Sequence, residues 1–178
     1  MISLFRSAPE LMVQYAHYHR DKRNIVTHLV GIPLIVLSIG MLLSLVSWNI
    51  AGYSVSLAAL LWVFSTLWYL TRGNLLLGVA TSVVNGVLIA LAHTPEAATG
   101  WGLSALYDAA WFPGLAVFVI GWIIQFVGHI FEGRKPAFVD DVVGLMVGPM
   151  FVVGEALMMA GMLRSMHSLI EAQAGATR

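Results

Sequence analysis

The sequence predicts an all-α integral membrane protein, a helical bundle of about five transmembrane helices with an N-terminal interfacial helix. Of its 178 residues, 59% are hydrophobic and only 10% are charged, whereas a soluble domain carries about 25% charged residues. Apolar runs recur at about the length of 20 residues that a bilayer core requires. Short polar segments separate these runs and hold most of the lysines and arginines.

Residues 1–24 are predicted to form a helix that lies on the membrane surface. Residues 7–10 fit a capping box, with Ser7 as the N-cap and Glu10 at the third helical position. Side chains then recur at helical spacing as far as His19. Asn24 is a plausible N-cap for the first span.

Residues 25–163 are predicted to form the transmembrane bundle, and residues 164–178 a polar tail, within one membrane domain covering 1–178. The five candidate spans are Ile25–Trp48, Tyr53–Leu70, Leu75–Ala92, Trp111–Phe131 and Val142–Leu163. Only four residues separate the second and third, which predicts a tight helical hairpin. Residues 94–108 contain proline and glycine and are expected to form a loop with a short interfacial helix.

The distribution of basic residues predicts the orientation, since loops rich in Lys and Arg stay in the cytoplasm. Seven of the nine basic residues fall on one face: Arg6, Arg20, Lys22, Arg23, Arg72, Arg134 and Lys135. Arg164 and Arg178 are expected on the other. We therefore expect a multi-pass protein of the bacterial inner membrane, or of the endoplasmic reticulum in a eukaryote. His19, His28, His129 and Glu132 then all lie at the cytoplasmic rim.

Composition also excludes several classes of function. The net charge is zero, so nothing favours nucleic acid as a partner. The chain has no cysteine, which excludes disulfides, thiolate ligands and a cysteine nucleophile. The oligomeric state cannot be read from the sequence.

His19 and His28 are the first candidate metal ligands. They are nine residues apart, which on one continuous helix would place them on opposite faces. The polar segment 20–24 suits a bend that would bring the two rings together. The alternative is that His19 is an interfacial residue and His28 a helix-packing one.

A second group lies at the end of the fourth apolar run. Gln125, His129 and Glu132 are spaced so that they share one helix face. Three histidines and a carboxylate suit an Fe(II) site that leaves positions open for substrate and O₂, and zinc is a weaker alternative. In the contrasting interpretation, Glu132 pairs with Arg134 or Lys135 and His129 packs at the interface.

The same segments resemble a known family, the membrane 2-hydroxy fatty acid dioxygenases. The N-terminal motif is Tyr15-x-x-Tyr18-His19-x-x-x-x-Asn24-x-x-x-His28-x-x-x-x-Pro33. The second runs from Gly121-Trp122-Ile123-x-Gln125 through His129 to Phe131-Glu132-x-x-x-Pro136-Ala137-x-x-Asp140. The gap from His129 to Glu132 is one residue shorter than in the yeast form, so the three histidines carry over more firmly than Glu132.

The resemblance implies an Fe(II) enzyme that shortens a 2-hydroxy fatty acid by one carbon through α-oxidation, with O₂ as co-substrate and membrane lipid as surroundings. The balance R-CH(OH)-COOH plus O₂ gives R-COOH, CO₂ and water, with no external reductant. The residues expected to draw in the substrate carboxylate are Arg20, Arg134 and Lys135. Those expected to orient the imidazoles are Tyr15, Asn24 and Gln125.

Two other classes of function remain open from the sequence. A non-enzymatic transporter subunit or assembly factor would explain the spans, but not three histidines on one rim. Another metal-dependent lipid-modifying enzyme would also use the histidines. The clustered histidine boxes of di-iron desaturases are absent from the sequence.

Overall fold

The computed structural model describes residues 5–178, apart from the side chain of Phe138. Helices dominate, which confirms the all-α prediction, and in the described range the strands are confined to one short antiparallel hairpin. In chain order the elements are α1 (Ala8–Ala16), α2 (Lys22–Ser44), β1 (Ser47–Ile50), β2 (Tyr53–Ser56), α3 (Leu57–Leu70), α4 (Leu75–Ala92), α5 (Pro95–Ala98), η2 (Gly100–Ala105), α6 (Phe112–Glu132), η3 (Ala137–Val139), α7 (Gly144–Met159) and α8 (Arg164–Ala174).

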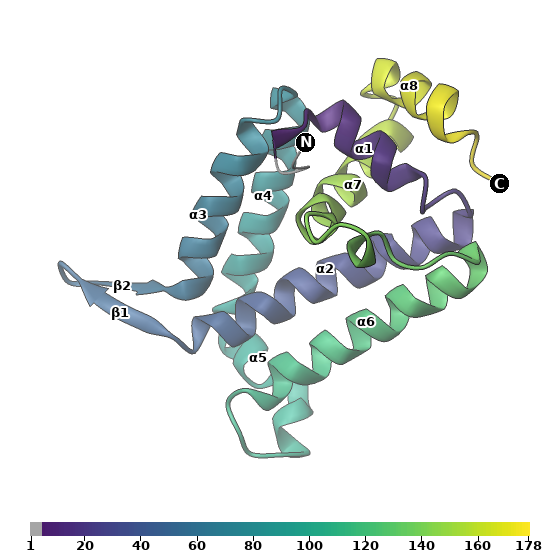
Figure 1. Cartoon of the computed structure of the whole chain (residues 1–178). Coiled ribbons are helices and arrows are strands. Elements are labelled where there is room, and N and C mark those ends of the chain that lie inside the picture. Colours follow the sequence, from purple (N-terminus) through teal and green to yellow (C-terminus); the bar gives the residue numbers. More distant parts are fainter. Residues whose placement is uncertain (1–4) are drawn as a thin grey trace.

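The bundle is built around α2 and α6, which lie side by side and run in opposite directions (Figure 1). The α3–α4 hairpin packs beside them. At one end, α1 lies across the bundle with α8 next to it, and α7 lies beneath both. The start of α2 and the end of α6 meet at this same end, which we call the rim. The β1–β2 hairpin projects from the opposite side of the bundle.

Three glycines on α6 let it approach α2 closely. Gly114, Gly121 and Gly128 are spaced seven residues apart, and each faces α2. A Cβ added at Gly121 would lie 3.1 Å from the carbonyl oxygen of Gly31, and one at Gly128 would overlap Thr27 Oγ1. Small residues at such positions allow the backbones of membrane helices to touch. We call this contact the glycine seam.

Local sequence signals explain most helix boundaries. The predicted capping box is confirmed, since the backbone N–H and hydroxyl of Ser7 both donate to Glu10. The predicted helical hairpin is also confirmed, with Asn74 as the N-cap of α4. Asn24 is not the N-cap of α2. That position belongs to Asp21, whose side chain accepts from the backbone N–H of Arg23, because Asn24 already lies inside the helix.

The second apolar run was predicted as one helix, but its first four residues form β2. Ser47 pairs with Ser56 and Ile50 with Tyr53 across the hairpin. The turn between the strands uses positive φ angles at Ala51 and Gly52. The run after it, α3, has only 14 residues, because Ser56 caps it at its start.

Each of the five predicted apolar runs contains a helix, and three of these helices are long and apolar enough to cross a membrane: α2, α4 and α6. A fourth candidate is α7 taken together with α8, which are bent by 112° at a short break. The predicted polar tail is therefore largely helical, as α8.

The structure corrects the side on which the chain ends. Arg178 was expected opposite the other basic residues. Its guanidinium lies 3.5 Å from Glu132 Oε1, and its backbone N–H donates to the carbonyl of Arg20. The bend after α7 turns the chain back, so Arg178 lies at the rim beside Arg20, Lys22 and Glu132.

Candidate metal centre

The bend between α1 and α2 brings His19 and His28 together, as the sequence predicts. Since α1 ends at Ala16 and α2 begins at Lys22, His19 lies in the connecting turn. The Nε2 atoms of the two imidazoles are 2.9 Å apart. His129, near the end of α6, completes the cluster, in which one ring nitrogen of each histidine lies within 4.8 Å of the others. The ring centroids are 4.3–5.1 Å apart.

The hydrogen bonds of His19 and His28 fix which ring nitrogen carries the hydrogen. Nδ1 of His19 lies 2.8 Å from the carbonyl oxygen of Tyr15, and Nδ1 of His28 lies 2.8 Å from that of Asn24. A carbonyl oxygen only accepts, so both Nδ1 atoms donate, and in the neutral ring each Nε2 keeps a lone pair. Two lone pairs therefore face each other, an arrangement that repels unless the rings share a cation.

Burial disfavours a proton as that cation. His19 is fully buried and His28 and His129 nearly so. Desolvation, and next the neighbouring His28, hold the pKa of His19 well below its ordinary value. Tyr15 stacks on the His19 ring with an interplanar angle of 3°, which leaves only the ring edge free to bind an ion.

The donor set fits a divalent transition metal. Imidazole suits iron and zinc, and a metal-bound histidine usually donates its other N–H to a carbonyl or carboxylate, as His19 and His28 do. Two ligands each about 2.0–2.1 Å from one ion can readily be 2.9 Å apart. Nδ1 of His129 is buried with no hydrogen-bond partner among the described residues.

Glu132 is close to this cluster along α6 but has other partners. Its Oε2 accepts the backbone N–H groups of Arg20 and Asp21 at 2.9 and 2.8 Å, and the Asn24 side chain at 3.1 Å. The carboxylate is 5% exposed. Glu132 therefore holds the turn that carries His19. The pairing with Arg134 or Lys135, which the alternative interpretation of the sequence expected, is replaced by one with Arg178.

The three residues expected to orient the imidazoles all lie next to the cluster. Tyr15 stacks on His19 and its carbonyl accepts from that ring. The carbonyl of Asn24 does the same for His28, while its side chain binds Glu132. Gln125 is 4% exposed, and its Nε2 has no hydrogen-bond partner in the described part of the chain.

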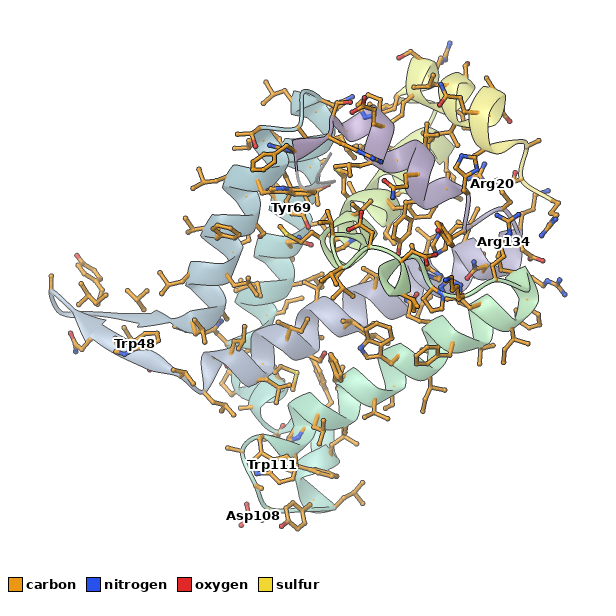
Figure 2. All side chains as sticks on the ribbon, viewed as in Figure 1. Arg20, Trp48, Tyr69, Asp108, Trp111 and Arg134 are labelled. Atoms are coloured by element: carbon orange, nitrogen blue, oxygen red, sulfur yellow. The ribbon has the colours of Figure 1, made fainter. Side chains whose placement is uncertain are left out.

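The three basic residues expected to bind substrate differ in their surroundings. Arg20 is buried and donates to the carbonyls of Ala16, His19 and Gly175. Arg134 and Lys135 are exposed at the rim, where Arg134 donates to the carbonyl of His17 and Lys135 lies 2.6 Å from Asp140. Figure 2 shows Arg20 and Arg134 at the same end of the molecule, far from Trp48 and Trp111.

A cavity of about 220 Å³ adjoins the imidazoles. His28, Gln125 and His129 line its rim end, and the remaining lining is almost wholly apolar. The sequence carries a signal for this cavity, because Phe118, Trp122, Gln125 and His129 follow one helical stripe on α6.

The other histidines do not join the cluster. His17 is exposed at the end of α1. His93 lies at the far end of α4, where its Nε2 is 2.9 Å from Ser56 Oγ. His167 is exposed and lies 3.7 Å from Glu171.

Comparison with known proteins gives two matches. Residues 5–160 match a family described as 2-hydroxy-palmitic acid dioxygenase Mpo1-like. The chain is also 31% identical, over 159 residues, to the 2-hydroxy-palmitic acid dioxygenase MPO1 of Saccharomyces cerevisiae, a match covering 88% of this chain and 83% of the yeast protein. No solved structure matches the chain.

Proposed function

This chain belongs to the Mpo1-like 2-hydroxy-palmitic acid dioxygenase family, and on that premise we propose that it is an Fe(II)-dependent dioxygenase of 2-hydroxy fatty acids. The reaction converts R-CH(OH)-COOH and O₂ into the one-carbon-shorter acid, CO₂ and water. The C1–C2 bond breaks, C2 is oxidised to a carboxyl carbon, and O₂ takes up the four electrons released. The observation that carries the proposal is the set of three buried imidazoles at the head of an apolar cavity.

His19, His28 and His129 are the proposed iron ligands. Iron bound there would supply a Lewis acid for the hydroxyl and carboxylate of the substrate and a redox centre for O₂. Glu132 fixes the turn of His19 through its two backbone N–H contacts. Burial around the imidazoles excludes water from the cleavage.

The rim is proposed to face the cytoplasm in a bacterial inner membrane. The positive-inside rule supports this side, and the return of Arg178 to the rim strengthens the bias. Arg134 and Lys135, exposed there, are proposed to attract the substrate carboxylate through their charge. The buried amide of Gln125 beside His129 is available to donate to a substrate oxygen.

The test is metal analysis and oxygen uptake on detergent-purified protein. We expect one iron per chain, oxygen consumption with 2-hydroxyhexadecanoic acid, and pentadecanoic acid as product by mass spectrometry. His129→Ala should abolish iron and activity. His93→Ala, at the far end of the bundle, is the matched control and should retain both. Wild-type protein that binds no iron, or that is active after His129→Ala, refutes the proposal.

A further inference from the structure

The cavity beside the imidazoles is a groove between two matching stripes of side chains. On α2 the lining residues run from His28 through Ile32 and Val36 to Ile39. On α6 they run from His129 back to Phe118. Each stripe spans eleven residue steps, from 28 to 39 and from 118 to 129. Since a helix rises 1.5 Å per residue, each stripe is about 16 Å long.

Polarity is divided along the groove. Its polar lining groups gather at the rim end, close to His28 and His129. The third wall comes from α7 and is built of small or apolar residues: Gly144, Leu145, Gly148 and Pro149. No charged residue is among the described groove-lining residues. A ligand that fits this arrangement has one polar end and a long apolar body.

We propose that this groove binds the alkyl chain of the substrate, and that Val36 and Ile39, which line it together with Trp122 and Phe118, determine how long a chain is accepted. This inference rests on the proposed function. It follows from the continuity of the groove with the imidazoles, since His28 and His129 belong to both. The same two helices therefore hold the reacting end of the substrate and limit the length of its alkyl chain.

Helix geometry gives each position a depth. Val36 is eight residues beyond His28 and Ile39 is eleven, so they lie about 12 and 16 Å along the helix axis. Carbon–carbon bonds of about 1.5 Å advance an extended alkyl chain by about 1.25 Å per carbon. Val36 is thus reached by about the tenth carbon of the tail and Ile39 by about the thirteenth.

The experiment compares Val36→Phe and Ile39→Phe across 2-hydroxy acids of 8 to 20 carbons. In wild type we expect kcat/KM to rise by up to about four-fold per methylene until the groove is filled. In Val36→Phe, kcat/KM should fall at least ten-fold for the longer acids and keep its wild-type value for the short ones. In Ile39→Phe, the same fall in kcat/KM should begin at acids that are about three carbons longer. Val30→Phe, on the outward face of α2 where Val30 is 51% exposed, should keep the wild-type profile.

Binding provides a second measurement that needs no turnover. Native mass spectrometry of chelator-treated protein with unhydroxylated fatty acids should show the same two length limits. If a phenylalanine variant fails to fold, Val36→Ala and Ile39→Ala enlarge the groove instead and should shift the preference to longer chains.

The outcomes separate this inference from the proposed function. Equal loss at every chain length, or length limits that do not move in either set of variants, overturns the assignment of the groove. Length-dependent binding by a wild-type protein that oxidises no 2-hydroxy acid supports the groove and refutes the proposed reaction.

Discussion

Glu132 offers a sharp test of how the candidate metal centre is held. In the structure its carboxylate accepts two backbone N–H groups and an amide from the turn beside His19. A residue in that role stabilises the turn that carries His19 and does not bind the metal. A residue that binds iron directly would need a carboxylate oxygen free for the metal. Replacing Glu132 by glutamine separates the two roles, because glutamine keeps a carbonyl acceptor but is a much weaker ligand.

The size of the effect follows from the contacts. Glu132→Ala leaves the N–H groups of Arg20 and Asp21 buried and unpaired, at about 1–3 kcal/mol each, so the free energy of unfolding should fall by about 2–6 kcal/mol. Glu132→Gln keeps an acceptor and loses only its charge. Hydrogen bonds to a charged group are stronger by about 1 kcal/mol each, so with three bonds to Oε2 this variant should lose about 3 kcal/mol.

The unfolding of both variants should be measured in detergent after chelation of the metal, so that metal binding does not contribute to the measured free energy. Iron content is then measured on separately loaded protein. We expect Glu132→Gln to retain one iron per chain and most of its oxygen uptake. If Glu132→Gln loses its iron while its stability stays near that of chelated wild type, Glu132 is a ligand and the reasoning fails.

Three further predictions concern the metal, the glycine seam and the cap of α1. Chelation should lower the thermal midpoint of wild type, since free metal at 100 times its Kd adds about 2.7 kcal/mol, and His28→Ala should show no metal-dependent shift; an unchanged midpoint in wild type would contradict the site. Gly121→Ala should lower the free energy of unfolding by about 1–3 kcal/mol, because it forces α2 and α6 apart. The control in thermal unfolding is Val119→Ala, since Val119 is 47% exposed. Equal thermal midpoints of the two variants would contradict the seam. Hydrogen bonds from Ser7 lower the pKa of Glu10 from 4.5. The stabilising effect of the Glu10 carboxylate should therefore be complete above pH 4.5 and disappear as the pH falls through the folded pKa. Glu10→Gln should flatten this part of the pH profile of thermal unfolding, and Ser7→Ala should lower the free energy of unfolding by about 1 kcal/mol.

The convergence of His19, His28 and His129 was predictable because two signals in the sequence indicate it. The polar segment after His19 indicated a bend. The basic residues placed the start of the first span and the end of the fourth at the same rim. The capping box of Ser7 and Glu10 was predictable from local sequence alone, since its two partners are three residues apart.

The partners of Glu132 were not predictable, since its backbone contacts reach 111 and 112 residues along the chain. The β1–β2 hairpin was missed because Tyr53–Ser56 continues an apolar run, and hydropathy does not distinguish a strand from a helix in so short a segment. Arg178 was assigned to the wrong side because hydropathy does not register the bend after α7.

The glycine seam has a consequence for how this enzyme family can diversify. His28 and His129 are kept in register by close contacts at Gly31, Gly121 and Gly128, and neither Val36 nor Ile39 is among the nearest neighbours of these glycines. The groove residues occupy a neighbouring stripe of the same two helices. In the role proposed for the groove, substitutions there change which chain lengths are accepted while the three imidazoles stay in place. The two stripes can therefore evolve at different rates, the seam under strict constraint and the groove, in its proposed role, under selection for the length of the alkyl chain.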